Sequence, residues 1–378
     1  MLLERLGEHI REVNVRNRDL AVTNLLGVSI SKVFMPSIAN TIGTDMSTYK
    51  IVKRGQFAYG PVTSRNGDKV SIALLDSFDD AIISQAYTVF EVKDNDKLLP
   101  EYLMMWFQRP EFDRYARFHS HGSAREVFDW SEMCDVRLPV PSIERQREIV
   151  AEYQTFTDRI NLNQQMIQKL EATAHALYQK TVVTGIDKEN LPPGWHLGTI
   201  GEFCKEIKSG GTPSRSHDDY WDRKDYPWLK SGEVHNNIII GVEEYISQKG
   251  LDNSSAKLIP QGAVTMAMYG ATASQVAYLD CETTTNQACC NMICQSKEDT
   301  AYLFFHLLAS QENIKKLANG GAQENLSQEL IAQQPIILVN DSTTKSHFIP
   351  ILDHLVILYK ENEKLTELQS LLLAKMGQ

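Results

Sequence analysis

The stretch GSAREVFDWSEMCDVRLPVP, at residues 122–141, is partly repeated later in the chain. The later stretch is GGAQENLSQELIAQQPIIL, at residues 320–338, and both begin with the pattern Gly-x-Ala-x-Glu. They start 198 residues apart, which is just over half of the 378-residue chain. This spacing indicates that the chain contains two copies of one unit.

Four further blocks repeat in the same order in both halves. LERLGEHIREV resembles GTIGEFCKEI, YKIVKRGQFAYG resembles AKLIPQGAVTMAMYG, IISQAYTVFEV resembles TTNQACCNMIC, and PEYLMMWFQ resembles TAYLFFHLL. One matching pentapeptide could arise by chance, but five blocks in one order indicate an internal duplication.

Each copy begins with β-rich runs and ends in a long helical segment. Runs such as KVSIALL and AYTVFEV are separated by turns rich in Gly, Asn and Asp, a pattern typical of short strands. A short helix is expected near residues 101–117 and again near 301–318. After Pro141 no Pro or Gly occurs until Gly185, and Ser142 is suited to cap a long helix that follows it.

A heptad pattern runs through this long segment and through its counterpart. The spacing alternates between four and three residues, the rule for a helix that packs on another helix. The first seam comprises Ile149, Tyr153, Phe156, Ile160, Asn163, Ile167, Leu170, Ala174 and Leu177, and the second comprises Ile351, His354, Leu358, Glu361, Leu365, Leu368 and Leu372. A core helix in a bundle is the alternative, but the length and the heptads favour an antiparallel pair of helices.

We therefore expect an α+β protein with two pseudo-twofold-related α/β domains, joined by two long antiparallel helices in a coiled coil. The expected parts are a domain at 1–141, a helix at 142–183, a linker at 184–197, a domain at 198–340 and a helix at 341–378. Asn163 and Glu361 lie midway along the two seams, so an antiparallel pair places them opposite each other. Polar residues there penalise slipped registers, unless both side chains simply face water.

The composition predicts a soluble chain in a reducing compartment. It is 42% hydrophobic and 23% charged, and no run approaches the ~18 apolar residues of a membrane span. No targeting segment is expected, and the predicted location is the cytoplasm. The six cysteines are then free thiols. Structural zinc at CETTTNQACCNMIC is a minor alternative, because that stretch has no Cys-x-x-Cys pair and no nearby histidine.

Catalytic signatures are missing from the sequence. It has no phosphate-binding loop, dinucleotide fingerprint, His-Glu-x-x-His motif or nucleophile elbow. NLPPGW, near residue 190, fails as an adenine methyltransferase motif because Leu191 interrupts it and no aromatic residue follows the prolines directly. Glu206 and Lys208 lack the upstream Pro-Asp of a metal-dependent nuclease. We therefore predict no catalytic residues and no metal.

The charge pattern is compatible with local DNA binding. A net charge of −10 argues against an indiscriminate nucleic-acid binder but permits a basic face. Basic and amide side chains, which suit phosphates and base edges, cluster in Gly-rich loops. A single such residue is usually a solvated surface charge, so the clustering supports the prediction. The candidate DNA-binding residues are Arg16, Arg18, Lys53, Arg54, Arg65, Lys69, Arg117, His121, Arg125, Lys208, Ser209, Thr212, Arg215, Lys230, Tyr269, Gln275 and Gln323.

The stretch GGTPSRSHDDYWDRKDYPWLKSGEV, at residues 210–234, resembles the opening of a target recognition domain in the DNA specificity subunit of type I restriction–modification enzymes. The two-copy layout and LPVPSIERQREIV resemble that family as well, whereas the first copy lacks the Thr-Pro and Tyr-Trp elements. The resemblance implies a non-catalytic subunit whose two domains read the halves of a split, asymmetric DNA target while the helices set their distance.

The resemblance also implies partners and cofactors. Two methyltransferase subunits would use S-adenosylmethionine to methylate adenine N6, and two restriction subunits can join them with ATP and Mg²⁺. No cofactor is expected on this chain itself. The alternatives are a helical scaffold or regulator that binds no DNA, and a modification enzyme that acts alone. A binding assay with duplex DNA at several salt concentrations distinguishes a DNA-binding protein from a scaffold, because phosphate contacts make the affinity fall steeply with salt.

Overall fold

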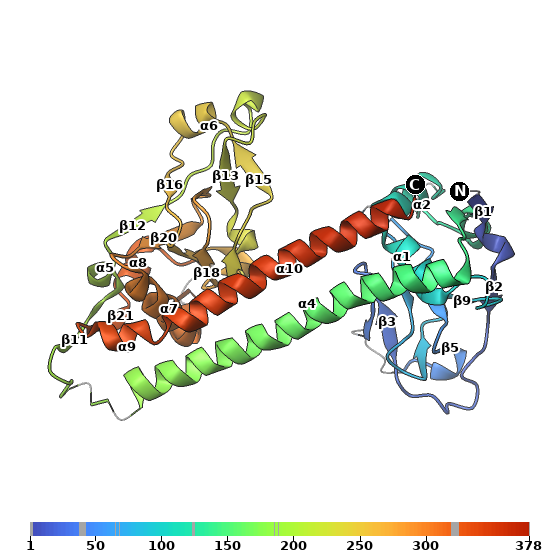
Figure 1. Ribbon diagram of the computed structural model, residues 1–378, viewed down its shortest axis with the longest axis horizontal. Coiled ribbons are helices and arrows are strands. Elements are labelled where there is room, and N and C mark those ends of the chain that lie inside the picture. The colour runs from blue at the N-terminus through green and yellow to red at the C-terminus, as the bar shows by residue number, and fades with distance from the viewer. Residues whose placement is uncertain are drawn as a thin grey trace. The chain divides into compact units, whose positions relative to one another are not determined.

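A computed structural model describes residues 3–37, 43–64, 66–67, 69–122, 125–184, 186–187, 189–318 and 325–377. The chain divides into two compact units (Figure 1). Unit 1 comprises Met1–Ile160 with Lys364–Gln378, and unit 2 comprises Asn161–Glu363. Each unit thus holds one copy of the repeat together with part of both long helices.

Unit 1 has a four-stranded antiparallel sheet in the order β2-β9-β6-β7, beside the two-stranded sheets β1-β10, β3-β4 and β5-β8. Its strands are β1 (Leu3–Arg5), β2 (Ile10–Val13), β3 (Leu26–Val28), β4 (Phe34–Pro36), β5 (Lys50–Lys53), β6 (Phe57–Tyr59), β7 (Ile72–Leu74), β8 (Asp80–Ile83), β9 (Thr88–Val92) and β10 (Arg137–Pro139). Its shorter helices are α1 (Pro100–Gln108), α2 (Pro110–Phe118) and α3 (Trp130–Asp135).

Local chemistry explains the helix boundaries in unit 1. Arg109 adopts an extended conformation before Pro110, which separates α1 from α2. Asp129 caps α3 by accepting hydrogen bonds from two backbone N–H groups. The core contains Phe57 stacked on Phe90 with ring centroids 4.8 Å apart, and Phe107 of α1 meets Phe57 edge to face.

Unit 2 has a five-stranded sheet in the order β12-β20-β17-β18-β14, a four-stranded sheet in the order β15-β13-β19-β16, and the pair β11-β21. Its strands are β11 (Trp195–Thr199), β12 (Glu206–Ser209), β13 (Tyr226–Leu229), β14 (Asn237–Ile239), β15 (Glu244–Ile246), β16 (Leu258–Ile259), β17 (Val264–Ala267), β18 (Val276–Leu279), β19 (Thr283–Thr285), β20 (Cys289–Ile293) and β21 (Pro335–Val339). Its shorter helices are α5 (Ile200–Phe203), α6 (Gln248–Asp252), α7 (Lys297–Ala318), α8 (Gln328–Ala332) and α9 (Ser342–Ser346).

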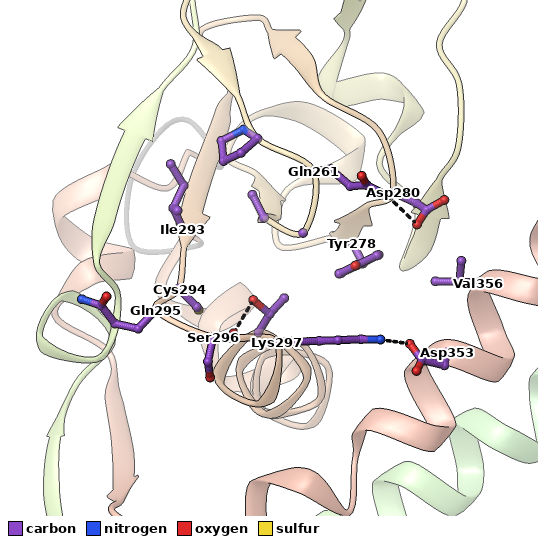
Figure 2. A pocket seen from close by; sticks show the side chains of 14 residues that line it. Gln261, Tyr278, Asp280, Ile293, Cys294, Gln295, Ser296, Lys297, Asp353 and Val356 are labelled. Atoms are coloured by element: carbon purple, nitrogen blue, oxygen red, sulfur yellow. Dashed lines mark hydrogen bonds and ion pairs between the residues drawn. The ribbon is translucent and has the colours of Figure 1, made fainter. Parts of the chain in front are cut away.

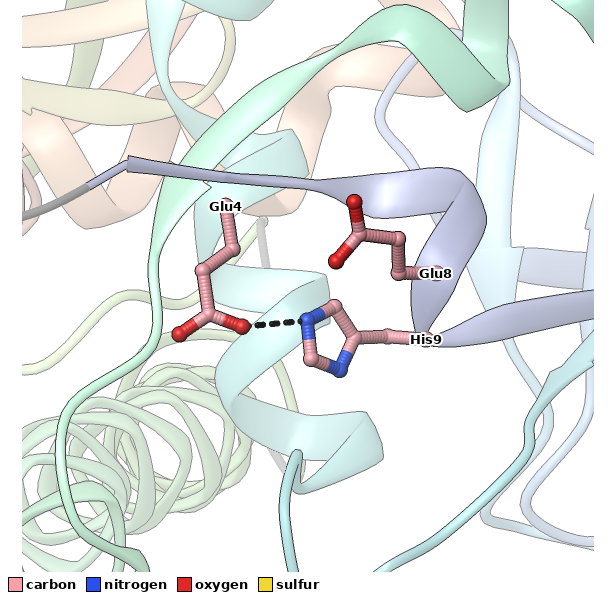
Figure 3. Close-up of side chains that lie close together, drawn as sticks. All are labelled: Glu4, Glu8 and His9. Atoms are coloured by element: carbon pink, nitrogen blue, oxygen red, sulfur yellow. Dashed lines mark hydrogen bonds and ion pairs between the residues drawn. The ribbon is translucent and has the colours of Figure 1, made fainter.

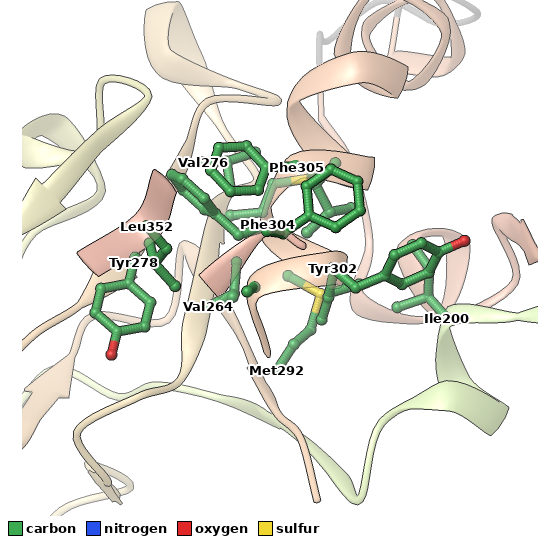
Figure 4. Packing of buried hydrophobic residues seen from close by; sticks show 14 of the residues in the cluster. Ile200, Val264, Val276, Tyr278, Met292, Tyr302, Phe304, Phe305 and Leu352 are labelled. Carbon is green, nitrogen blue, oxygen red and sulfur yellow. The ribbon is translucent and has the colours of Figure 1, made fainter. Parts of the chain in front are cut away.

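The core of unit 2 joins α7 to the five-stranded sheet. Figure 4 shows Phe304 and Phe305 of α7 among Val264, Val276 and Met292 of the sheet strands. All five side chains are almost completely buried. Burial of this apolar surface is the main stabilising contribution available to the unit.

The two copies use the same closing contact. In each, the first strand pairs antiparallel with the last one, β1 with β10 and β11 with β21. A tyrosine that the repeat aligns then donates its hydroxyl to a backbone carbonyl of that last strand. Tyr102 bonds to Pro139 at 3.1 Å and Tyr302 bonds to Ile337 at 2.9 Å. The duplication seen in the sequence is therefore also a duplication of tertiary contacts.

The long helices are α4 (Ile143–Tyr178), which continues as a π-helical turn over Gln179–Val183, and α10 (Ile349–Lys375). Two expected boundaries are wrong. Helix α10 begins at Ile349 rather than at 341, because Asp341 caps the separate helix α9. The second domain begins with β11 at Trp195 rather than at 198, because that strand pairs along its length with β21. Pro350 lies in the first turn of α10, where a proline is tolerated.

The helix seams largely follow the predicted positions, with a correction in α10. Asn163, Ile167 and Ala174 are buried in α4, and the other predicted seam residues of α4 are half-buried. In α10, however, Leu368 is 45% exposed. The neighbouring Gln369 lies inward and donates to Thr157 Oγ1 at 2.8 Å. His354 is likewise exposed while Leu355 is buried.

The reason for this error is local degeneracy in the pattern. Positions 351, 355, 358, 362, 365, 369 and 372 also alternate by four and three residues. The two series share positions 351, 358, 365 and 372 and differ at 354–355, 361–362 and 368–369. At 368–369 a sequence reading follows the more apolar residue, Leu368. In the folded helix pair Gln369 lies inward instead of Leu368, because a glutamine that hydrogen-bonds across the seam tolerates burial.

The structure brings the two seam midpoints together. Asn163 Nδ2 donates to Glu361 Oε2 at 3.0 Å and to Asn362 Oδ1 at 2.9 Å. Further along unit 2, the ring of Tyr178 near the end of α4 lies 6.3 Å from that of Phe348, just before α10. The helices are therefore antiparallel within unit 2, and Asn163 pairs with both polar residues at the middle of α10. Among the described residues, no helix is both long and apolar enough to cross a bilayer.

Candidate nucleic-acid interface

In unit 2 the Tyr-Gly and Gln-Ala motifs lie beside each other. The Tyr-Gly motif lies at the end of β17, where Tyr269 forms a backbone bridge with Asn325, the residue after the Gly-x-Ala-x-Glu motif. Met268 N–H donates to the Ala288 carbonyl of the Gln-Ala motif at 2.8 Å. Two motifs that are separated in the sequence therefore adjoin in space, and Asn325 lies beside them, while residues 319–324 lie outside the described part.

Two glycines let the loop from residue 210 lie close to these motifs. A Cβ atom at Gly210 would clash with the Thr285 and Asn286 carbonyl oxygens. Beyond the glycines, the exposed Thr212 donates its hydroxyl to Gln287 Oε1 at 2.5 Å. The sequence candidates Thr212 and Tyr269 thus lie on two loops that both contact the Gln-Ala turn.

Arg215 and Lys230 belong to one charged cluster on this unit. The Arg215 guanidinium lies 3.5 Å from the ring centroid of Trp221 and its Nη2 is 2.6 Å from Glu244. Lys230 Nζ lies 2.8 Å from Glu243 and 3.1 Å from Glu244. The hydrogen bonds that Lys230 donates to these carboxylates, to Glu243 first, raise the pKa of Lys230. Burial acts to raise the pKa of Glu244, but hydrogen bonds from Arg215 and Lys230 hold it below its ordinary value.

The remaining candidates of unit 2 are mostly engaged within the protein. Lys208 Nζ lies 2.8 Å from Glu206, and Ser209 donates to Gln328 Oε1 at 2.7 Å. Gln275 is half-buried, and its backbone carbonyl accepts from Ala267 N–H. Gln323 lies outside the described residues. Lys208 and Ser209 therefore have structural partners that the sequence pattern did not reveal.

In unit 1 the corresponding motifs line a groove of about 330 Å³. Gly60 of the Tyr-Gly motif, Ala86 of the Gln-Ala motif and Arg125 of the Gly-x-Ala-x-Glu motif all face it. Arg125 is exposed, and among the described residues no carboxylate forms an ion pair with it. This groove combines a concave surface, backbone polar groups and a free guanidinium, which suits a phosphate or a base edge.

Contacts between two loops hold the wall of this groove. Thr63 Oγ1 donates to Ser120 Oγ at 3.0 Å, and Thr63 N–H donates to the Glu126 carbonyl at 3.0 Å. Arg117 Nη1 donates to the Gly67 carbonyl at 2.8 Å and lies 3.7 Å from Glu126. Arg117 therefore helps to hold these two loops together.

The neighbouring basic candidates are exposed. Lys69 extends into solvent, and His121 Nε2 lies 3.6 Å from Glu132 with a side chain that is 71% exposed. Arg65 falls outside the described residues. The structure therefore brings together Arg117, at the end of α2, and three residues of adjoining loops, Lys69, His121 and Arg125, as the clustering in the sequence suggested.

A second basic group in unit 1 lies on other turns. Arg16 donates to the Thr48 carbonyl and approaches Gln85 Oε1 at 3.5 Å. Arg54 lies 3.0 Å from Asp79. Arg18 and Lys53 are exposed, and among the described residues neither has an ion-pair partner. Among these four residues, Arg54 is the least suited to contact DNA, because its charge is already paired with Asp79.

Two aromatic features of the interface escaped the sequence reading. One is the stacking of Arg215 on Trp221. The other is Phe118, at the end of α2, whose side chain is 81% exposed beside Arg117. Helix periodicity could have revealed it, since Phe112 and Ala116 mark the buried face of α2 and position 118 falls off that stripe.

A groove of about 550 Å³ elsewhere in unit 2 is a poor site for an anion (Figure 2). Its cation Lys297 is paired with Asp353 at 2.5 Å. Asp280, which also lines it, is paired with Lys360 at 2.6 Å. The charges in the groove are thus neutralised by partners within the unit, and its lining includes no residue of the Tyr-Gly or Gln-Ala motif.

One group of side chains could hold a metal ion. Figure 3 shows Glu4, Glu8 and His9 close together, with His9 Nε2 2.8 Å from Glu4 Oε2. The three residues come from one short segment, and the hydrogen bond accounts for the position of His9 without an ion. No cysteine joins such a group among the described residues. All six thiols are free, and Cys289 and Cys290 are buried in β20, as expected for strand packing.

The chain has two copies of an α+β domain, each with a long helix and with Tyr-Gly and Gln-Ala motifs beside basic residues, and this arrangement defines a tandem DNA-recognition protein. The chain belongs to the family of the type I restriction modification DNA specificity domain, whose pattern matches residues 40–172 and 192–371. The two matched segments correspond to the two copies of the repeat.

Curated relatives and a solved structure agree with this assignment. The chain is similar to the type I restriction enzyme HindI specificity subunit of Haemophilus influenzae, at 21% identity over 98% of this chain and 97% of that protein. It is also similar to the MjaIX specificity subunit of Methanocaldococcus jannaschii, at 22% identity over 46% of this chain and 43% of that protein. The S subunit of a type I system from M. genitalium has the same fold, with a TM-score of 0.59, 14% identity and coverage of 100% of this chain and 96% of that one.

Proposed function

We propose that each unit reads one half of a split DNA sequence and that the two halves differ. The observation that carries this proposal is that the Tyr-Gly and Gln-Ala motifs adjoin beside basic side chains in both units, joined in unit 1 by Arg125 of the Gly-x-Ala-x-Glu motif. A repeated arrangement of this kind suits a target with two parts.

The asymmetry of the target follows from differences between the copies. Unit 2 carries the Arg215–Trp221 stack and the Glu244 ion pairs, whereas unit 1 offers a groove with the unpaired Arg125. Side chains that read base edges must match the donors and acceptors of those bases. Two different sets of side chains are therefore expected to select two different half-sites rather than a palindrome.

The chain would act as the specificity subunit of a larger complex and would itself be non-catalytic. Support comes from the names of its relatives, which are specificity subunits of type I restriction enzymes. In this proposal two methyltransferase subunits carry S-adenosylmethionine, and restriction subunits, where present, carry ATP and Mg²⁺. The spacer helices α4 and α10 would contribute to docking of the methyltransferase and would set the gap between half-sites.

A domain exchange tests this proposal in the intact complex. Residues 1–141 would be replaced by the matching segment of the HindI specificity subunit, and the chain would be produced with its methyltransferase. Sequencing of methylated adenines in the host genome would then report the recognised sequence. We expect one half of the target to change while the other half remains, and a change in both halves would refute modular reading.

A further inference from the structure

We propose that Phe118 and Leu317 are apolar wedges, each of which stacks against or enters a base step in one half of the DNA target. This inference rests on the proposed DNA-reading function and adds an apolar contact with the bases to the contacts made by charged side chains. Phe118 ends α2 and Leu317 lies near the end of α7. Both helices lead into the Gly-x-Ala-x-Glu segment of their copy.

Phe118 has almost no place in the protein core. Its side chain is 81% exposed, whereas Phe112 of the same helix is 3% exposed. Its one described ring contact is an edge-to-face approach to His119, with centroids 5.2 Å apart. His119 is in turn stacked on Tyr115 at 4.2 Å. The neighbouring rings thus support the base of Phe118 and leave the phenyl group directed away from the core.

The second copy repeats this feature with a different side chain. Leu317 is 45% exposed in the last turn of α7, next to the exposed Lys315 and Lys316. Phe118 lies four residues before the Gly-x-Ala-x-Glu motif of its copy and Leu317 lies three residues before that of the other. An exposed large apolar residue in the last helical turn before this motif in both copies is a second, independent observation. Either one alone would be an ordinary surface residue.

The charges around the two residues indicate DNA as the occupant. Arg117 precedes Phe118, and His121 and Arg125 lie on the adjoining loop. Leu317 follows two lysines. A protein partner would be expected to cover an apolar centre that is depleted of charge. An isolated apolar side chain among cations instead suits a site where phosphates meet the cations and the apolar group meets bases.

A binding series at several salt concentrations separates stacking from charge. Phe118→Ala should weaken the binding of the intact chain to a duplex that carries both half-sites, on the order of ten-fold, since one base–aromatic stack contributes that much. The slope of log Kd against log salt should stay unchanged, because loss of a phenyl group releases no counterions. Leu317→Ala should act in the same way on the other half-site.

Two further measurements locate the contact. Phe118→Trp should retain binding, and its indole fluorescence should be quenched by the duplex. A duplex with 2-aminopurine at successive positions should brighten at one step in complex with the unmodified chain and remain dark with Phe118→Ala. The matched control is Phe78→Ala, because Phe78 is 45% exposed on the turn between β7 and β8 and lines a different groove.

The outcomes distinguish this inference from the proposed function. If the unmodified chain shows no sequence preference, the function itself fails. If it binds specifically and Phe118→Ala binds equally well, the wedge alone is refuted. A lower salt slope for Phe118→Ala would also overturn the wedge, since the effect would then run through Arg117. Thermal melting shows whether each variant folds. If Phe118→Ala does not fold, Phe118→Gln takes its place in the same measurements.

Discussion

At the scale of single residues, the interface divides into charges that are already paired and charges that are free. Arg54, Arg117, Arg215 and Lys230 all lie within 4 Å of a carboxylate. Arg125 is exposed and faces a groove lined by two of the repeated motifs. Exposed ion pairs contribute little stability, but a paired guanidinium must exchange its partner before it can bind a phosphate. Free charges are therefore the better candidates for phosphate contacts.

The substitution Arg125→Gln should weaken DNA binding and flatten its salt dependence. Loss of one phosphate contact reduces the slope of log K against log salt by about one. Arg54→Gln is the matched control, because Arg54 is equally exposed but paired with Asp79, and it should leave the slope unchanged. We expect Arg65, which lies outside the described residues, to behave as Arg125 does. Equal slopes for Arg125→Gln and the unmodified chain would remove Arg125 from the interface.

A buried histidine should make unit 2 less stable in acid. Burial lowers the pKa of His306 from its ordinary 6.5 to about 4, and its Nδ1 lies 2.6 Å from the Tyr178 hydroxyl. The unfolded chain therefore takes up a proton below pH 6.5 that the folded chain refuses until about pH 4. Stability is present above pH 6.5 and is lost as the pH falls through that window.

Denaturant unfolding at pH 7 and pH 5 measures this effect. The difference in unfolding free energy between the two pH values should be smaller in His306→Gln than in the unmodified chain, because the full contribution is of the order of 3 kcal/mol. His235→Gln serves as the control, since His235 is exposed. An identical pH dependence in His306→Gln would show that other groups cause the loss.

At the scale of elements, α4 and α10 carry a polar layer in an otherwise apolar seam. Asn163 is 2% exposed and donates to both Glu361 and Asn362. Its neighbours along the seam of α4 are Ile160 and Ile167. A slipped register would place the buried amide opposite apolar side chains and leave it without partners, which costs more than the native pairing contributes. The layer therefore favours one register of the two helices.

Replacement of Asn163 by leucine should keep or raise the thermal stability of the chain while it weakens this selection. In the complex with a methyltransferase, sequencing of methylated sites should then detect more than one gap length between half-sites. Gln165→Leu, an exposed position of the same helix, is the control and should retain one gap. A single unchanged gap in Asn163→Leu would contradict the proposed role of the polar layer.

At the scale of the whole molecule, continuous helices connect two units that each have their own core. The division between the units falls inside α4 and inside α10. A helix rises about 1.5 Å per residue, so its length can define a distance between the parts that it joins. The two DNA half-sites would then be separated by a gap that depends on the helices rather than on the reading loops.

Insertion of four residues into α4, about one turn or ~6 Å, should lengthen the gap between half-sites. The bases recognised in each half should stay the same, because the loops that read them are untouched. Methylome sequencing measures both quantities at once. A complex that assembles and methylates at the original gap would exclude the helices as the measuring element.

The sequence alone determined the duplication, the long helices and the family resemblance. These properties are local or repetitive, since heptads, turn residues and a second copy of each block are visible without knowledge of the fold. The prediction of Asn163 opposite Glu361 belongs to this class, because an antiparallel pair with equal spacing brings midpoints together by symmetry alone.

Only the tertiary structure decided which motifs meet and which charges are paired. One groove of unit 1 is lined by Gly60, Ala86 and Arg125, which are distant in the chain. Arg54 forms an ion pair with Asp79, which lies 25 residues further along the sequence. The choice of Gln369 over Leu368 also came from the fold, through a hydrogen bond to Thr157. Burial and ion pairing depend on contacts through space, and those contacts are set by the joint packing of many residues rather than by a local pattern.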